Sequence, residues 1–500
     1  MRAHSFPADF PADLETATVQ ELLEGMRSSR FSAVELVRAC LARIDALNLR
    51  GPALHAVRDV APDAEDQARR ADEARRRGMD GPLLGIPVLI KDNIDVASMT
   101  TTAGSIALRS LVPSTDAVVV GNLRAAGCVI LGKCNLTEFA NFMTENMPSG
   151  YSSLTGQVLN PYDLSLTPSG SSSGAPAAVV SGMAPLAVGT ETSGSVLAPA
   201  EAQSAVGVKP TVGLVSRTGI VPISPTQDTA GPVARTVADA ARLLAAMAGP
   251  DPEDPATAEA PRPFALDPEA LDPRALAGAR LGIITSFDDT LPAEARTLWE
   301  GARSDLAGQG ATLVPVELPH PSGDYTVLLY EFGPALDAYL AGHPGGAGSV
   351  GGGSVPRTLA EIVAYNQDHS GQALKFGQSR LLASRDMDRD GDRPRYEQAR
   401  ARDLAESRQR IDALLYEHHL DALVSPGVES YDTGARAGYP SVTVPAGYRS
   451  DGRRPFGVQF LGGRWSEARL LDLAYSYESA TRLRRPPSVI NPTLLRGTGL

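Results

Sequence analysis

Apolar residues recur every three or four positions in the first part of the chain. The stretch TVQELLEGMRSSRFSAVELVRACLARIDALN (18–48) shows this period and predicts two amphipathic helices. Ser32 is the expected N-cap of the second helix, with Glu35 three residues on completing a capping box. A charged helical pattern, EDQARRADEARRRG, follows at 65–78. Residues 1–80 are therefore predicted to form an N-terminal helical region.

The pattern changes near residue 81 to short apolar runs interrupted by Gly and Pro. These runs read PLLGIPVLIKD (82–92), AVVVGNLRAAGCVILGKCN (117–135), APLAVGTE (184–191) and SAVGVKPT (204–211). They alternate with alanine-rich helical segments such as PAAVVSGM and VADAARLLAAMAG. Alternation of strand and helix patterns favours an α/β core on a central mixed sheet, which we assign to residues 81–250.

Two connections interrupt the later part of the chain. Residues 251–275 are acidic and rich in proline, and residues 343–356 are rich in glycine, as expected of surface connections. Strand-like runs resume beyond 275, for example ATLVPVEL (311–318) and YPSVTVPAG (439–447). Residues 276–500 are therefore expected to continue the same α/β domain, giving one large domain with a central mixed sheet flanked by helices.

Composition and charge exclude several classes of protein. The net charge of −12 disfavours a broad nucleic-acid-binding face. The chain holds three cysteines, which cannot all pair, so reduced buried thiols are expected. The first fifteen residues lack an apolar signal core, and no apolar run of about 18 residues occurs. These features predict a cytoplasmic protein without membrane partners, and they specify no oligomeric state.

Two glycine-flanked serine clusters carry the candidate chemistry: SGSSSG (169–174) and SGS (193–195). The histidines nearest to Ser195 in sequence are more than a hundred residues away, and the seven histidines of the chain lack motif context. We therefore expect solvated histidines. Lysine is the other base that a serine can use. Lys91 ends an apolar run, where loss of hydration would lower its pKa towards neutrality.

A nucleophile elbow is an alternative interpretation of the first cluster. GSSSG (170–174) fits G-x-S-x-G with Ser172 as nucleophile. The elbow requires a strand that runs directly into the turn, whereas the preceding NPYDLSLTPSG is rich in turn residues. The sequence therefore disfavours this alternative.

Five ordered blocks resemble the amidase signature family: GIPVLIKDNID, SGSSSGAPAAVVSG, GTETSGSVLAPAEAQSAVGVKPT, GLVSRTGIVPIS and QDTAGPVARTVADAA. The resemblance extends over residues 15–485. It implies the fold of that family and a Ser–cis-Ser–Lys triad without a cofactor. In this chain Ser195 matches the nucleophile, Ser171 the bridging serine after a cis peptide bond, and Lys91 the base.

Backbone donors are expected beside the nucleophile. The N–H groups of Thr192, Ser193 and Gly194, together with that of Ser195, could form a nest around a developing oxyanion. A helix that starts near Ala175 would direct its positive end at the same site. Candidate residues of the substrate pocket are Ala140, Met143 and Glu201.

The blocks MPSGYSS and RTLAEIVAYNQDHS resemble bacterial peptide amidases, which release ammonia from C-terminally amidated peptides. The resemblance implies an amidohydrolase that cleaves a linear carboxamide through an acyl-enzyme. Ser193, Glu201 and Gln203 depart from the usual family residues. An acyltransferase or cyclase that uses the same triad with an amine acceptor therefore stays open as the alternative.

Residues 386–397 (DMDRDGDRPRYE) fit the calcium-loop pattern D-x-D-x-D-G-x5-E. Interleaved arginines offset the carboxylates, and no second loop is present to pair with this one. The sequence favours a charged, solvated loop without metal, with a weak calcium site as the alternative.

Overall fold

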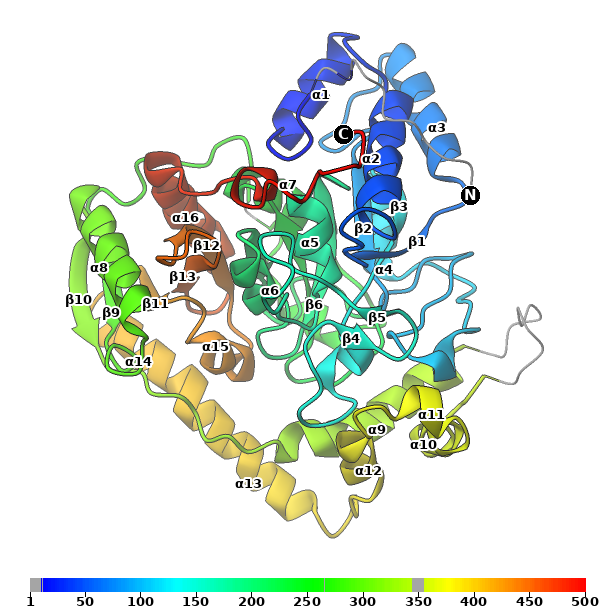
Figure 1. Ribbon diagram of the computed structural model, residues 1–500. Helices are drawn as coiled ribbons and strands as arrows, with labels where there is room; N and C mark the ends of the chain where they lie inside the picture. The colour runs from blue at the N-terminus through cyan, green and yellow to red at the C-terminus, as the bar shows by residue number, and fades with distance from the viewer. Residues whose placement is uncertain (1–9, 11, 265, 344–354) are drawn as a thin grey trace.

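An eleven-stranded mixed β-sheet runs through the protein (Figure 1). The computed structural model describes residues 10, 12–264, 266–343 and 355–500, so most of the glycine-rich connection predicted at 343–356 lies outside the described residues. The order of strands across the sheet is β1 (Val57–Val60), β3 (Val129–Cys134), β2 (Pro87–Lys91), β6 (Leu186–Glu191), β8 (Thr229–Ala234), β7 (Val206–Lys209), β12 (Ser441–Tyr448), β13 (Pro455–Leu461), β11 (Ala422–Pro426), β9 (Arg280–Ile284) and β10 (Thr312–Val316). Strands β4 (Tyr151–Ser152) and β5 (Gly156–Gln157) form a separate small ribbon.

Helices flank the sheet along its whole length (Figure 1). The first half of the chain contributes α1 (Val19–Arg27), α2 (Ala33–Leu47), α3 (Ala64–Arg76), α4 (Val118–Ala125), α5 (Gly174–Val180), α6 (Leu197–Ala202) and α7 (Val237–Met247). The second half contributes α8 (Ala293–Gly308), α9 (Thr326–Ala341), α10 (Leu359–Asp368), α11 (Ser370–Ala373), α12 (Ser379–Arg385), α13 (Arg393–Leu404), α14 (Arg410–Glu417), α15 (Tyr431–Ala437), α16 (Glu467–Thr481) and α17 (Pro487–Ile490). Short 3-10 turns lie at Ile106–Leu108, Glu138–Asn141 and Pro255–Glu259, and a π-helical turn lies at Ala405–Gln409.

The N-terminal helices begin where the sequence predicts. Ser32 caps α2, and its hydroxyl accepts from the Glu35 amide while the Glu35 carboxylate accepts from the Ser32 amide. Thr18 and Glu21 form the same capping box on α1. Each box satisfies two amides that the first helical turn would otherwise leave unpaired. Figure 1 shows α1, α2 and α3 together beside β1–β3, with the C-terminus nearby.

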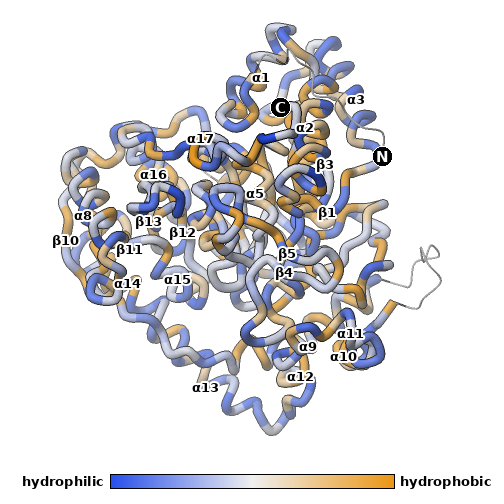
Figure 2. Tube along the Cα trace, viewed as in Figure 1, coloured by the Kyte–Doolittle hydropathy of each residue, from blue (hydrophilic) through white to orange (hydrophobic). Residues whose placement is uncertain are grey.

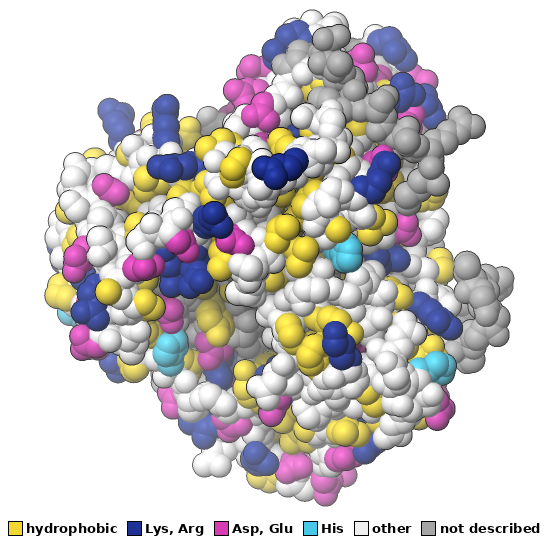
Figure 3. Space-filling model, viewed as in Figure 1, with side chains coloured by type: hydrophobic (Ala, Val, Ile, Leu, Met, Phe, Trp, Pro, Cys, Tyr) yellow, Lys and Arg dark blue, Asp and Glu magenta, His cyan; other side chains and the backbone are white. Residues whose placement is uncertain are grey.

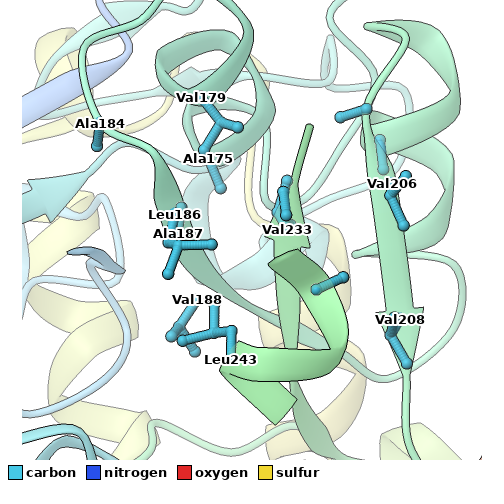
Figure 4. Packing of buried hydrophobic residues seen from close by; sticks show 14 of the residues in the cluster. Ala175, Val179, Ala184, Leu186, Ala187, Val188, Val206, Val208, Val233 and Leu243 are labelled. Atoms are coloured by element: carbon cyan, nitrogen blue, oxygen red, sulfur yellow. The ribbon is translucent and has the colours of Figure 1, made fainter. Parts of the chain in front are cut away.

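The centre of the sheet is buried on both faces. Every residue of β2, β3 and β6 is buried, which explains why these strands read as continuous apolar runs rather than as alternating ones. Figure 4 shows Val188 of β6 and Val233 of β8 among the small side chains that fill this core, with Ala175 and Val179 of α5 above them. In Figure 2 many of the hydrophobic stretches of the chain accordingly lie in the interior of the molecule. The cysteines Cys40, Cys128 and Cys134 are buried and free, as predicted.

Strands from both sides of the proline-rich connection share one sheet. β12 pairs antiparallel with β7, with Ser441 opposite Lys209, and so joins the later strands to the earlier ones. The predicted α/β class with a large mixed sheet is confirmed. β2 is parallel to both β3 and β6, so the carboxyl ends of β2 and β6 meet at the same edge of the sheet. Lys91 is the last residue of β2, and the second serine cluster (193–195) follows the end of β6.

The segment that fits the calcium-loop pattern joins α12 to α13. α13 begins at Arg393 and takes the last five residues of the pattern into a helix, because Pro394 suits a first helical turn. Asp386 pairs with Arg385, and the Asp388 carboxylate accepts from the Asp390 amide. Across the described ranges, no group of three or more His, Cys, Asp or Glu side chains is arranged to hold a metal ion.

Among the described helices, none is both long and apolar enough to span a membrane. Basic and acidic side chains are interspersed over the face of the molecule shown in Figure 3.

Candidate active site

Lys91 is the last residue of β2 and is fully buried. Because β2 runs parallel to β6, with Ile90 opposite Val188, the Lys91 side chain reaches Thr190 near the end of β6. Its Nζ atom lies 2.8 Å from Thr190 Oγ1, 3.2 Å from Thr190 O and 2.8 Å from Ser171 Oγ. The sheet register therefore brings together the lysine and the first serine cluster, 80 residues apart in the chain.

The two serine clusters meet through the backbone. The Gly170–Ser171 peptide bond is cis, as the family resemblance implied, and the Ser172 amide donates to the Ser195 carbonyl at 3.0 Å. Glycine is required at position 170, since an added Cβ would lie 2.5 Å from Thr137 Oγ1. Ser171 is fully buried, whereas Ser195 is 7% exposed and lines a cavity.

Burial sets the protonation of Lys91. Loss of hydration lowers the pKa of Lys91 to about 7, and this effect outweighs the attraction of Cys134, Glu191 and Asp228, which favour the charged form. A neutral amine has two N–H groups and one lone pair. With Thr190 O and Thr190 Oγ1 as acceptors for the two N–H groups, the lone pair is left for the Ser171 hydroxyl.

The turn before Ser195 leaves only part of the predicted set of backbone donors free, because the Gly194 amide donates to the Glu191 carboxylate. The amides of Ser193 and Ser195 donate no hydrogen bond within the described chain, and both residues line the cavity. Gly194 has φ +78°, and an added Cβ there would lie 2.8 Å from the Tyr431 ring. The buried Glu191 carboxylate accepts from the amides of Val196 and Leu197 at 2.8 and 3.0 Å, which fixes the chain just beyond Ser195.

Two carboxylates hold the side chains of this turn. The Thr192 hydroxyl donates to Asp228 Oδ1 at 2.5 Å, and the Ser193 hydroxyl donates to Asp432 Oδ1 at 2.7 Å. Asp432 also accepts from Arg436 at 3.0 Å. Burial raises the pKa of Asp228 to about 6. Charge-assisted bonds of this kind are stronger than neutral ones and keep the turn in one geometry.

A cavity of about 370 Å³ opens in front of Ser195. Apart from the serine turn, its lining comes from the 3-10 turn Glu138–Asn141 and the residue after it, from the loop before β8, from the start of α9 and the segment before it, and from α12, α13 and α15. Phe139, Ala140 and Asn141 in the 3-10 turn Glu138–Asn141 all have left-handed backbone angles, with φ of 47°, 51° and 70°. Left-handed residues other than glycine are uncommon, and three in succession turn the chain sharply at the cavity wall.

The predicted pocket residues separate in the structure. Ala140 lines the cavity. Met143 is 1% exposed and packs in the apolar cluster around Phe332, and it is not part of the lining. Glu201 also lies outside the lining. Its Cγ packs against Gly457, and burial raises the pKa of the Glu201 carboxyl group to about 7. The departure at Gln203 has a structural role, because its amide donates to Pro168 O and Ser173 O behind the first serine cluster.

Ser172 does not form a nucleophile elbow. Its hydroxyl is buried, donates to Thr190 O at 3.1 Å and accepts from the Thr190 amide at 3.2 Å. It therefore joins the cluster to β6, and it is not part of the lining of the cavity in front of Ser195.

The histidines are less uniform than the sequence predicts. His320 is 54% exposed at the side chain, as expected of a solvated residue, but it lines the cavity. His343 is 15% exposed and bonds Asp95 at 2.7 Å, so the prediction of a solvated histidine is wrong there. The carboxylate attracts the imidazolium and raises the pKa of His343 against the opposing effect of burial.

Several site residues were missed by sequence reasoning. Thr190, Gln227 and Asp228 lie inside the quoted blocks GTET and QDTAGP, and their position in these blocks was the available signal. Asp432 and Arg436 reach the site from α15, some 240 residues beyond Ser193, and no local pattern marks them.

The fold and this buried Ser–Lys arrangement define a class of enzyme. The family profile described as Amidase matches residues 35–471, and the chain belongs to this family. It is an amidase, an enzyme that hydrolyses amides.

Three known proteins illustrate the similarity. A peptide amidase from Stenotrophomonas maltophilia has a solved structure with a TM-score of 0.89 and 44% identity, covering 94% of this chain and 98% of that one. A probable amidase of Arabidopsis thaliana is 39% identical over 489 residues, covering 95% of this chain and 92% of its own. A glutamyl-tRNA(Gln) amidotransferase component from Cereibacter sphaeroides is 34% identical, covering 94% of this chain and 98% of its own.

Proposed function

We propose that this amidase hydrolyses the C-terminal carboxamide of short peptides through an acyl-enzyme on Ser195. The observation that carries the proposal is the buried contact between Lys91 Nζ and Ser171 Oγ, directly behind the turn that presents Ser195 to the cavity. The 44% identity to a peptide amidase supports the choice of substrate.

In the first step Ser195 Oγ attacks the amide carbon. Its proton passes to Ser171 Oγ, and the Ser171 proton passes to the neutral Lys91 amine. The carbonyl oxygen becomes an oxyanion, to which the free amides of Ser193 and Ser195 donate. Thr192 and Ser193 are held by Asp228 and Asp432, so these donors need no rearrangement as charge develops.

In the second step the tetrahedral intermediate collapses and its C–N bond breaks. The relay returns one proton to the leaving nitrogen, which departs as ammonia and leaves an ester on Ser195. Water then attacks the ester and gives one proton to the same relay; as the ester C–O bond breaks, the relay returns this proton to Ser195 Oγ and the peptide leaves as a free acid. Lys91 ends each half-reaction neutral.

Transfer of the acyl group to an amine is the second candidate, since an amidotransferase component is 34% identical to this chain. A neutral, N-acetylated peptide amide should be incubated with the enzyme alone and then with an added amine. Ammonia and the free acid as dominant products in both cases support hydrolysis. A new amide that forms only with the amine, without turnover in its absence, contradicts hydrolysis and favours transfer.

A further inference from the structure

The cavity in front of Ser195 is lined by both acidic and basic side chains. Its charged lining residues, histidine aside, are Asp324, Asp403, Asp432, Arg380 and Arg436. Arg436 forms ion pairs with both Asp403 and Asp432, and Asp324 pairs with Arg402 behind the wall. These pairs satisfy all but one of the charged lining residues.

Arg380 is the exception. No carboxylate of the described ranges lies within ion-pairing distance of its guanidinium, whose one hydrogen bond there runs from Nη1 to the Asn141 carbonyl at 3.0 Å. The guanidinium carbon lies 4.6 Å from the centre of the Tyr325 ring and 5.7 Å from that of Phe142. The two rings hold the cation in place at the cavity, and its Nε and Nη2 donors keep no partner from the described chain.

The position of Arg380 is not explained by helix stability. It is the second residue of α12, where the positive end of the helix dipole disfavours a cation. Tyr325, against which it stacks, is 46% exposed. An arginine that is poorly placed for its helix, fixed by aromatic rings and left with free donors is suited to a planar anionic ligand.

The remaining charges favour one place for that ligand. Arg436 is shared by two carboxylates, so the Asp403–Arg436–Asp432 group has one negative charge in excess, and it reaches the reacting end of the cavity through the Ser193–Asp432 bond. An anionic group is repelled at that end and attracted at Arg380.

We infer that Arg380 is a specificity-determining residue that binds a carboxylate on the acyl part of the substrate, so that peptide amides with an acidic residue before the C-terminal one are preferred. This inference rests on the proposed function. The guanidinium offers two parallel N–H groups to the carboxylate, as in bidentate Arg–carboxylate pairs.

The test compares matched peptide amides within each enzyme variant. The substrates are acetyl-glutamyl-leucinamide and acetyl-methionyl-leucinamide, and the same pair with one alanine inserted before leucine. In the wild type, kcat/KM for the glutamyl substrate should exceed that for the methionyl one by about 10-fold in at least one pair, from a charge-assisted hydrogen bond. In Arg380→Met the ratio should fall to about 1. Arg380→Lys, which keeps the charge without the fork, should give an intermediate ratio.

Arg385→Met is the matched control, because Arg385 ends the same helix, pairs with Asp386 and lies outside the cavity. It should keep the wild-type ratio. A ratio near 1 in the wild type, or an equal ratio in Arg380→Met, overturns the inference while the hydrolysis itself stands.

Binding separates this failure from failure of the proposed function. If none of the four amides is turned over, the proposed function fails, and calorimetric titration of Ser195→Ala with the glutamyl peptides still tests Arg380. Tighter binding of the glutamyl than of the methionyl peptide, lost on adding Arg380→Met, supports the carboxylate site. Equal binding with and without Arg380 overturns it.

Discussion

Lys91 Nζ lies 2.8 Å from Ser171 Oγ at the buried end of β2. Both residues are fully buried, so this contact is shielded from solvent. The lysine therefore loses hydration, and its pKa falls to about 7, which makes a group that is normally an acid at neutral pH into a base.

Activity should depend on pH through Lys91. Below a pH of about 7 the amine holds a proton and cannot accept another from Ser171, so kcat/KM should fall about tenfold per pH unit as the pH drops further. The measurement is a pH–rate profile on a neutral peptide amide. Lys91→Arg is the matched control: it keeps a cation that does not lose its proton, and it should be inactive across the profile. Activity in Lys91→Arg that rises through pH 7 would refute the assignment of the base.

The same pKa predicts a stability effect. In the unfolded chain Lys91 holds its proton up to a pH near 10.5, whereas in the folded chain it loses it near 7. Between these values the unfolded state binds more protons, so the contribution of Lys91 to the free energy of unfolding rises with pH, by about 1 kcal/mol per unit. Below pH 7 this contribution no longer changes.

Lys91→Met removes that contribution. The difference in unfolding free energy between wild type and Lys91→Met, measured by urea titration, should therefore shift in favour of the wild type from pH 7.5 to 9.5. A constant difference over this range would mean that Lys91 is charged in the folded enzyme.

Gly194→Ala should inactivate the enzyme. The new Cβ would meet the Tyr431 ring at 2.8 Å in a left-handed conformation, so the turn that carries the Ser193 and Ser195 amides must move. We expect a loss in kcat on the order of 100-fold, comparable to removing an oxyanion donor. Gly452→Ala, also at positive φ but with open space around it, is the control for backbone strain alone. Full activity in Gly194→Ala would show that the turn does not bind the oxyanion.

Ser193→Ala should lower kcat more than it raises KM. The substitution removes the hydrogen bond to Asp432 at 2.7 Å and leaves the turn less firmly held, for which we expect about a 10-fold loss. Ser193→Thr keeps the hydroxyl and should retain most of the activity. Equal losses in the two variants would indicate that bulk at this position matters rather than the bond to Asp432.

Much of the site could be predicted because its parts lie in contiguous blocks. Lys91 ends an apolar run, and Ser171 and Ser195 lie in two glycine-containing serine clusters, so local pattern marked these segments and the family resemblance singled out the residues within them. The mixed sheet could be predicted for the same reason, since its central strands are short apolar runs bounded by Gly and Pro.

The cavity wall could not be predicted in this way. Arg380 and Asp432 come from α12 and α15, about 200 residues or more from the serine turn, and each is an ordinary surface-helix residue in its local sequence. Glu201 is near Ser195 in sequence, but α6 turns it towards Gly457 and away from the cavity. Sequence proximity is a poor guide here, because the helix after the nucleophile directs successive side chains to different faces.

The most direct measurement is which residue becomes phosphonylated by a fluorophosphonate. The enzyme should be treated with a fluorophosphonate, digested, and mapped by mass spectrometry. We expect one adduct, on Ser195, absent in Ser195→Ala and formed at least about 100-fold more slowly in Lys91→Met, because the nucleophile then lacks its base. An adduct on Ser172 or Ser193, or labelling of Ser195 at the wild-type rate in Lys91→Met, would contradict this expectation.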